Sequence, residues 1–287
     1  MKKLVISQPG KLGDILITAP MAKYYYDAGY EEIHWPVFDN FKGILERFPY
    51  VKPVLFGVSL DSKSYLSDKR VSFYDKSCTA GIRSAQFYQQ FYSTYLKSPE
   101  FEMLDACFAF PGHRNDRNNQ HGSRYIQENK SWIQLKYDLA EVPLKNRWKL
   151  EYTREEGKEE KLLEFIRNYS KQKYGSYEYS IVQRYQSSPI RPLPHYEAHN
   201  PIIFSYIDGY EIVDWLRVLE EASEIVCVDS CLTHFVEVSP SLKEVKKVYL
   251  GTEEPHYIPF MSNILFNNWI NLSSADISYG VESANDL

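Results

Sequence analysis

The sequence predicts an α/β protein made of two consecutive doubly wound units, each with a parallel sheet covered by helices. The length of 287 residues exceeds one domain of about 150 residues and falls short of three. The composition, 44% hydrophobic and 25% charged, excludes fibrous and largely disordered proteins. Short apolar runs alternate with helical patterns in both halves, which is typical of parallel sheets. We therefore expect one unit at 1–152 and a second at 153–287.

In the first half, short apolar runs closed by turn residues predict the strands. The run KLVISQP (3–9) predicts a buried strand, and the helix after it begins near Asp14 and ends at Gly29. The other expected elements of this half are strands at 31–38, 51–58 and 104–111 and helices at 41–48 and 81–96. The polar, basic segment 112–125 is a candidate for a long functional loop.

The second half opens with an amphipathic helix at 155–175, which has Leu162, Leu163, Phe165 and Ile166 clustered on one face and Gly175 as its stop. Strands are expected at 179–185, 201–206, 224–229 and 246–251, with a helix at 211–222. Two doubly wound units would leave a cleft lined by the carboxyl ends of both sheets, which is where such sheets bind ligands.

The sequence carries no mark of a membrane-spanning, secreted or disulfide-stapled protein. No apolar run approaches the ~18 residues that span a bilayer, and Pro9 interrupts the first apolar run too early for a signal peptide. The four cysteines, Cys78, Cys107, Cys227 and Cys231, include no CxxC pair. We therefore expect a cytoplasmic protein with free thiols.

The net charge of −5 is unevenly divided between the two halves. Residues 1–150 hold 21 Lys and Arg against 16 Asp and Glu, whereas residues 151–287 hold 12 against 22. A basic half beside an acidic half favours an anionic ligand or substrate that approaches the first half. Charge scattered over a solvated surface would give the same counts.

The first motif is QPGKLGD (8–14), a glycine-bearing turn between the first strand and the first helix. Glycines let the backbone approach a ligand, and a helix N-terminus supplies free amides. The dinucleotide fingerprint needs three glycines at fixed offsets, so Gly10 and Gly13 alone disfavour NAD binding. Asp14 has two interpretations, a structural N-cap or a general base aimed at a ligand.

The second motif lies at 225–237, where a predicted strand, a turn and a helix follow one another. Its polar residues are Asp229, Ser230, Thr233 and His234. A helix dipole, hydroxyl donors and an imidazole around one helical turn suit a diphosphate or a ribose. The alternative is a pair of capping residues followed by a buried histidine.

Together the two motifs resemble the heptosyltransferase family, glycosyltransferase family nine. Residues 13–20 (GDILITAP) are similar to its G-D-x-x-x-x-x-P element, and residues 229–234 (DSCLTH) to its D-[ST]-G-x-x-H element. Residues 248–252 (VYLGT) are similar to the strand and turn that follow in the family. The resemblance implies a GT-B architecture, two Rossmann-like domains facing a central cleft, with the acceptor in the first and the donor nucleotide sugar in the second.

The resemblance also implies roles for individual residues, with Asp14 as the general base. The implied donor-binding residues are Gly13, Asp229, Ser230, Thr233 and His234. Two positions depart from the family pattern: Gln8 replaces its usual arginine, and Cys231 replaces the glycine of the second motif. The nearest candidates for the basic residue that meets the donor diphosphate are Arg184 and Arg191.

The acceptor-binding candidates are Lys11, Arg114, Arg117 and Arg124. Residues 113–149 hold eight Lys and Arg against four Asp and Glu, which fits an anionic acceptor such as a lipopolysaccharide-core saccharide. Tyr125 and Trp132 stand among these cations, a combination that also fits nucleic acid. A glycosyltransferase acting on hydroxymethylated pyrimidine bases of DNA is therefore the alternative, and a solvated loop would explain the same residues.

The leading hypothesis is an inverting, metal-independent hexosyl- or heptosyltransferase. No cluster of His, Cys or carboxylate residues has metal-ligand spacing, so no metal or other cofactor is expected beyond the nucleotide-sugar co-substrate. A second alternative is a nucleotide-binding module without catalysis, which Gln8 and Cys231 suggest. The presence of Asp14 argues against it.

Overall fold

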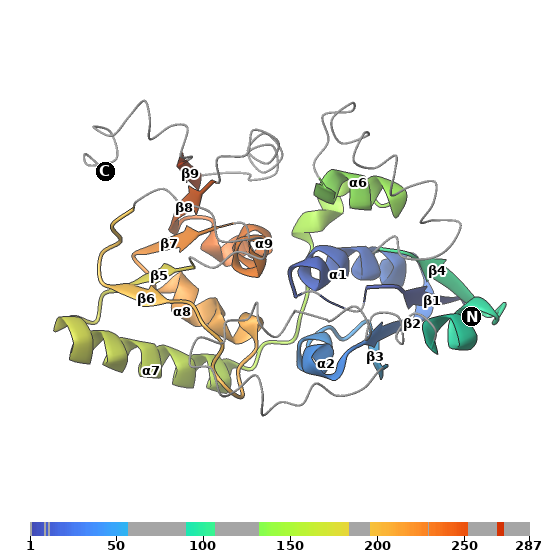
Figure 1. Cartoon of the computed structure of the whole chain (residues 1–287), viewed down its shortest axis with the longest axis horizontal. Coiled ribbons are helices and arrows are strands. Elements are labelled where there is room, and N and C mark those ends of the chain that lie inside the picture. Colours follow the sequence, from blue (N-terminus) through green and yellow to red (C-terminus); the bar gives the residue numbers. More distant parts are fainter. Residues whose placement is uncertain are drawn as a thin grey trace. The chain divides into compact units, whose positions relative to one another are not determined.

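The computed structural model describes residues 2–8, 10, 12–56, 90–106, 132–183, 196–228, 230–251 and 269–272. The chain divides into two compact units, Met1–Thr153 and Arg154–Leu287. Each unit has its own parallel sheet, flanked by helices (Figure 1). The predicted α/β class with parallel sheets is confirmed.

The sheet of unit 1 has the order β3-β2-β1-β4, and every pair in it is parallel. Its strands are β1 (Lys2–Ile6), β2 (Tyr30–Val37), β3 (Lys52–Leu55) and β4 (Phe101–Leu104). The chain adds β2 and β3 on one side of β1 and then β4 on the other. The strand order therefore reverses between β1 and β4.

The strand predicted at 104–111 is wrong in its position. It ends at Leu104, because Phe101–Leu104 pairs with Lys3–Ile6 of β1. β4 has one neighbour in the described sheet, and Glu102 on it is exposed and accepts a hydrogen bond from the Tyr30 hydroxyl. Such a half-exposed strand lacks the continuous apolar run that marks a buried one. Residues 107–111 lie outside the described residues.

The helices of unit 1 differ from the predicted ones mainly in their bounds. They are α1 (Leu12–Asp27), η1 (Asp39–Phe41), α2 (Lys42–Leu45), the π-helical turn η3 (Tyr92–Leu96), α6 (Trp132–Leu139) and η4 (Leu144–Trp148). The predicted stop of the first helix at Gly29 fits the turn after α1, where φ is +90° and a side chain would be strained. Most of the predicted helix at 81–96 lies outside the described residues.

Helix α1 is largely buried between Leu12 and Ala22, where it packs against β2 and η4, and α6 lies beside it (Figure 1). Two tyrosine hydroxyls join the helices: Tyr137 donates to the carbonyl of Ile17 at 3.1 Å, and Tyr25 donates to that of Ala140 at 2.8 Å. The sequence patterns did not predict α6. The two hydrogen bonds fix it along the length of α1.

The sheet of unit 2 has the order β6-β5-β7-β8-β9 and is also parallel. Its strands are β5 (Ser180–Val182), β6 (Pro201–Ile203), β7 (Glu224–Cys227), β8 (Lys246–Leu250) and β9 (Trp269–Leu272). The first four agree with prediction, whereas β9 was not predicted. The order reverses between β5 and β7, whose Val182 and Val226 pack with Val248 in the core.

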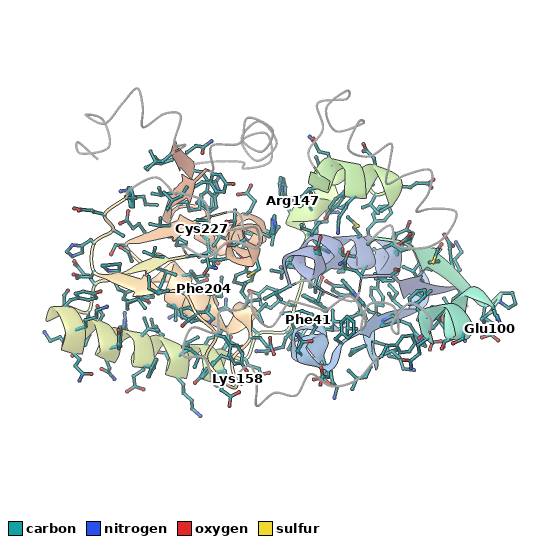
Figure 2. All side chains as sticks on the ribbon, in the orientation of Figure 1. Phe41, Glu100, Arg147, Lys158, Phe204 and Cys227 are labelled. Atoms are coloured by element: carbon teal, nitrogen blue, oxygen red, sulfur yellow. The ribbon has the colours of Figure 1, made fainter. Side chains whose placement is uncertain are left out.

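The helices of unit 2 are α7 (Glu156–Tyr174), η5 (Ile212–Trp215), α8 (Leu216–Glu220), α9 (Cys231–Val238) and η6 (Pro240–Leu242). The predicted stop of α7 is confirmed, since Gly175 caps it in the left-handed conformation at φ 74°. The predicted apolar face is wrong at Phe165, which is exposed, whereas Leu162, Leu163 and Ile166 are buried. Helix α7 packs on η5 and α8, and the Tyr179 hydroxyl donates to the Val218 carbonyl of α8 at 2.9 Å. Phe204 meets Trp215 edge to face, with ring centroids 4.7 Å apart (Figure 2).

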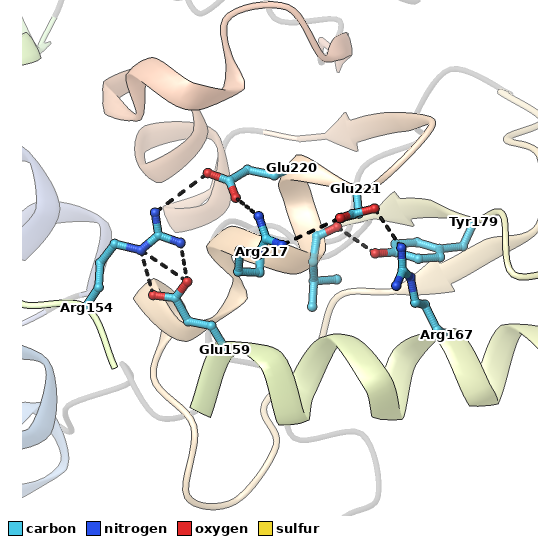
Figure 3. A network of polar contacts seen from close by, with 8 residues as sticks. Arg154, Glu159, Arg167, Tyr179, Arg217, Glu220 and Glu221 are labelled. Atoms are coloured by element: carbon cyan, nitrogen blue, oxygen red, sulfur yellow. Dashed lines mark hydrogen bonds and ion pairs between the residues drawn. The ribbon is translucent and has the colours of Figure 1, made fainter. Parts of the chain in front are cut away.

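A ladder of ion pairs joins α7 to α8 (Figure 3). Arg154 donates from its Nε and Nη2 atoms to the carboxylate of Glu159, which is fully buried. The Nη1 atom of Arg154 lies 3.9 Å from the Oε1 atom of Glu220. Arg167 of α7 contacts Glu221 at 2.8 Å. Just before Arg154, Thr153 donates its amide to the Arg47 carbonyl at 2.7 Å, and the Arg47 guanidinium donates to the Thr153 carbonyl at 3.1 Å. Consecutive residues are therefore tied to different units.

Candidate functional site

Two sheet edges are candidate sites because ligands of doubly wound proteins bind at the carboxyl ends of strands where the strand order reverses. In unit 1 this edge lies between β1 and β4, and α1 begins there directly after β1. In unit 2 it lies between β5 and β7, and α9 begins there directly after β7. Both sequence motifs lie at these positions.

Asp14 lies in the first turn of α1, one residue after Gly13. Because α1 begins at Leu12, Asp14 is inside the helix, and its interpretation as the N-cap is wrong. Its carboxylate accepts a hydrogen bond from the Lys136 ammonium at 2.6 Å. The Asp14 side chain is 28% exposed, whereas that of Lys136 is 1% exposed. A carboxylate that solvent can reach is thus held by a cation that solvent cannot.

Gln8 completes this cluster from the end of β1. Its Oε1 accepts a second hydrogen bond from the Lys136 ammonium at 3.0 Å, and its Nε2 donates to the carbonyl of Gly10. The Trp35 indole donates to the Gln8 carbonyl at 2.8 Å. The backbone and the side-chain amide of Gln8 are therefore both fixed.

Lys136 was not predicted as a site residue. It was counted among the basic residues of 113–149, although it is almost completely buried. One signal could have found it: Ile133, Tyr137 and Ala140 are also buried and share its side of α6 at helical spacing. A lysine among apolar residues on the buried face of a helix needs an anionic or polar partner.

At the second edge, α9 begins without a side-chain cap. Ser230 is its N-cap residue in an extended conformation, yet its hydroxyl makes no cap hydrogen bond. That Oγ atom is buried and has no hydrogen-bond partner among the described residues. The first amides of a helix point outward along its axis and attract anions. The start of α9 therefore offers donors without an acceptor from its own N-cap side chain.

The other residues of the second motif have separate surroundings. Thr233 is fully buried, and its hydroxyl donates to the Val228 carbonyl at 2.5 Å, which closes the turn between strand and helix. His234, one helical turn after Ser230, is half-buried, and its backbone amide donates to the Ser230 carbonyl at 3.3 Å. A contact between either residue and a nucleotide stays a prediction.

Two cysteines flank this turn. Cys227, the last residue of β7 (Figure 2), and Cys231, the first of α9, are both free thiols. Burial raises the pKa of the Cys231 thiol to about 12 and that of Cys227 further above its usual value. Neither thiol is therefore ionised at neutral pH, which removes both as candidate nucleophiles.

Seven predicted site residues lie outside the described residues: Lys11, Arg114, Arg117, Arg124, Arg184, Arg191 and Asp229. Their donor and acceptor roles stay predictions. Within the described ranges, no group of three or more His, Cys, Asp or Glu residues could hold a metal ion. No helix in the same ranges is both long and apolar enough to cross a bilayer.

The fold and the two edges define a two-unit doubly wound α/β protein, and comparison with known proteins gives its structural neighbours. No family model and no curated protein matches the sequence. Among solved structures, a glycosyl transferase of family 9 from Veillonella parvula aligns with 99% of this chain and 89% of its own, at 12% identity and a TM-score of 0.56. The chain therefore shares its α/β fold with parallel sheets with that glycosyl transferase structure.

Two heptosyltransferase structures from E. coli are also similar. The ADP-heptose lps heptosyltransferase II aligns with 95% of this chain and 90% of its own, at 12% identity and a TM-score of 0.49. The heptosyltransferase WaaC, solved with ADP, aligns with 99% and 100% at 12% identity and a TM-score of 0.47.

Proposed function

We propose that the protein is an inverting, metal-independent glycosyltransferase that uses a nucleotide-sugar donor. The fold shared with a family 9 glycosyl transferase supports this class. Each unit contributes one part of the chemistry: a carboxylate in unit 1 and an anion-binding helix N-terminus in unit 2. The acceptor hydroxyl attacks the anomeric carbon, its proton passes to Asp14, and the bond to the diphosphate breaks with its electron pair on the leaving oxygen.

The start of α9 is the observation that carries the proposal. It lies where the strand order reverses, and its Ser230 hydroxyl is buried without a partner among the described residues. The leaving diphosphate gains negative charge as the glycosidic bond breaks, so fixed donors that face it lower the barrier. Helix amides, Ser230 and His234 supply such donors without a metal.

Asp14 suits the role of base because its carboxylate is partly exposed and is held by a hydrogen bond from the buried Lys136 ammonium. A base must lie within hydrogen-bond reach of the proton that it removes. The hydrogen bond from Lys136 restricts the orientations of the Asp14 carboxylate and so favours one fixed geometry. Asp14 is thus the proposed catalytic residue.

The acceptor is proposed to be an anionic saccharide. Two of the basic residues in 113–149, Lys136 and Arg147, are buried and add no charge to the surface, and Arg147 stacks over the Trp148 ring at 4.7 Å (Figure 2). The acceptor class therefore depends on the other cations of that segment. DNA containing hydroxymethylated pyrimidine serves as the competing acceptor in the test.

The donor site is tested by measuring the affinity for UDP-, GDP-, ADP- and CMP-sugars by calorimetry, in the presence of EDTA. Ser230→Ala and His234→Ala should each weaken binding of the preferred sugar about 5- to 150-fold, because a hydrogen bond to a charged group contributes about 1–3 kcal/mol. Ser239→Ala is the matched control: it removes a hydroxyl at the other end of α9, bonded to the Phe235 carbonyl at 2.7 Å.

The control should leave the affinity unchanged. Equal losses in Ser230→Ala and Ser239→Ala would remove the α9 N-terminus from the site. No binding of any nucleotide sugar would overturn the function. Binding of a nucleotide sugar without transfer of its sugar, either to the anionic saccharide or to DNA containing hydroxymethylated pyrimidine, would favour the non-catalytic nucleotide-binding module.

A further inference from the structure

We propose that Lys136 is a positioning residue for the reaction: it holds the Asp14 carboxylate in the orientation in which that group accepts the proton. This inference rests on the proposed role of Asp14 as the base. The inference is drawn from the bridge formed by the Lys136 ammonium, which donates to the Asp14 carboxylate at 2.6 Å and to the Gln8 Oε1 atom at 3.0 Å. The Lys136 side chain is almost fully buried.

The bridge has a defined direction at Gln8. The Nε2 atom of Gln8 donates to the Gly10 carbonyl, so its Oε1 is the amide atom that accepts from Lys136. Gln8 is itself buried, and the Trp35 indole donates to its carbonyl at 2.8 Å. The amide therefore directs the ammonium toward Asp14.

The lysine is equally well fixed from its own helix. The next residue, Tyr137, is fully buried and bonds the Ile17 carbonyl of α1 at 3.1 Å, and the Ala140 carbonyl accepts from Tyr25 of α1 at 2.8 Å. Both helices that carry the ion pair are thus joined on either side of it. The Lys136 ammonium has little freedom to follow a carboxylate that turns away.

The hydrogen bond from Lys136 competes with a second orientation that is open to the Asp14 carboxylate. An aspartate in the first turn of a helix can bond to its own helix amides, and a carboxylate turned that way would cap the helix instead of meeting a ligand. An ammonium has three donors and no acceptor, so it holds an anion and does not compete for the proton of an acceptor hydroxyl. Lys136 acts on the reaction through Asp14 and does not contact the reacting atoms.

The test compares turnover per folded molecule with donor affinity in Lys136→Met and Lys136→Gln. Methionine keeps the buried alkyl chain and removes both the charge and the hydrogen bond, whereas glutamine keeps a donor. We expect Lys136→Met to lower kcat at least tenfold with donor Kd within twofold of the unchanged protein, and Lys136→Gln to recover part of the loss. The folded fraction is measured by circular dichroism.

The matched control is Lys23→Met, which breaks another lysine–aspartate pair of 2.6 Å on α1, to Asp27. It should leave kcat unchanged. A kcat within twofold in Lys136→Met, together with an inactive Asp14→Asn, would overturn the inference and leave the proposed function standing. Full turnover in Asp14→Asn would overturn the base role and the inference with it. If Lys136→Met does not fold, Lys136→Leu replaces it as the variant without a donor, and a kcat within twofold in Lys136→Leu also overturns the inference.

Discussion

Asp14 and Lys136 make unequal contributions to stability, because they are buried to different degrees. Asp14→Asn leaves the Lys136 ammonium in a site where its side chain is 1% exposed. Removing one partner of a buried pair costs about 3–5 kcal/mol. The asparagine carbonyl can still accept one hydrogen bond, which offsets about 0.5–1.5 kcal/mol. We therefore expect Asp14→Asn to lower the free energy of unfolding of unit 1 by about 2–4 kcal/mol.

The opposite change should cost less. Lys136→Met leaves a carboxylate that is 28% exposed and can be solvated, and it fills the lysine site with an apolar chain of similar length. Replacing a buried charge by a well-packed apolar group is often close to neutral, but the buried Gln8 Oε1 atom loses its donor, so we expect a loss of about 1–2 kcal/mol. The double variant should be as stable as Lys136→Met, and therefore more stable than Asp14→Asn.

The assay is native-state hydrogen–deuterium exchange of peptides from α1 and α6, which reports on unit 1 without requiring both units to unfold together. The control pair is Lys23 and Asp27, where the aspartate is 51% exposed and either truncation should cost no more than about 1 kcal/mol. Equal destabilisation by Asp14→Asn and Lys136→Met, or a double variant less stable than Asp14→Asn, would refute the reasoning.

Two further predictions concern unit 1. Gly10→Ala should lower the stability of unit 1 by about 1–3 kcal/mol, because the new Cβ would lie 2.5 Å from the ring of the buried Phe41. Gly157→Ala, in α7 of unit 2, has open space around its new Cβ and should not lower the stability of that unit; a melting temperature unchanged by Gly10→Ala would contradict this reasoning. Burial holds the pKa of the His34 imidazole below its usual value of 6.5. The neutral imidazole therefore contributes stability that is fully present above pH 6.5 and is lost as the pH falls through the lowered pKa of the folded protein. An NMR titration midpoint for His34 at or above 6.5 would contradict this.

Most of the fold could be predicted because buried parallel strands are continuous apolar runs in the sequence. The apolar runs of β1, β5 and β7 are of this kind. The exceptions are β4, predicted too late, and β9, not predicted. Both lie at the end of their described sheet and are partly exposed, so their sequences FEML and WINL have no distinctive pattern.

The candidate site could be predicted only where its residues are close in the sequence. The first motif places Asp14 after β1, and the second places Ser230 before α9, since each motif contains its own strand, turn and helix start. Lys136 could not be found this way, because it reaches Asp14 across 122 positions. The hydrogen bond from the Thr233 hydroxyl to the Val228 carbonyl could not be predicted either, because it depends on how the turn closes.

The contacts of Thr153 and Arg154 determine how the chain can be cut into independently folding fragments. Thr153 is hydrogen-bonded to Arg47 and completes unit 1, whereas Arg154 neutralises the buried carboxylate of Glu159. A fragment that starts at the first residue of α7, Glu156, would keep the helix and lose that cation, leaving a buried charge uncompensated. A recombinant fragment of unit 2 therefore has to begin at Arg154 or earlier, two residues before its first helix.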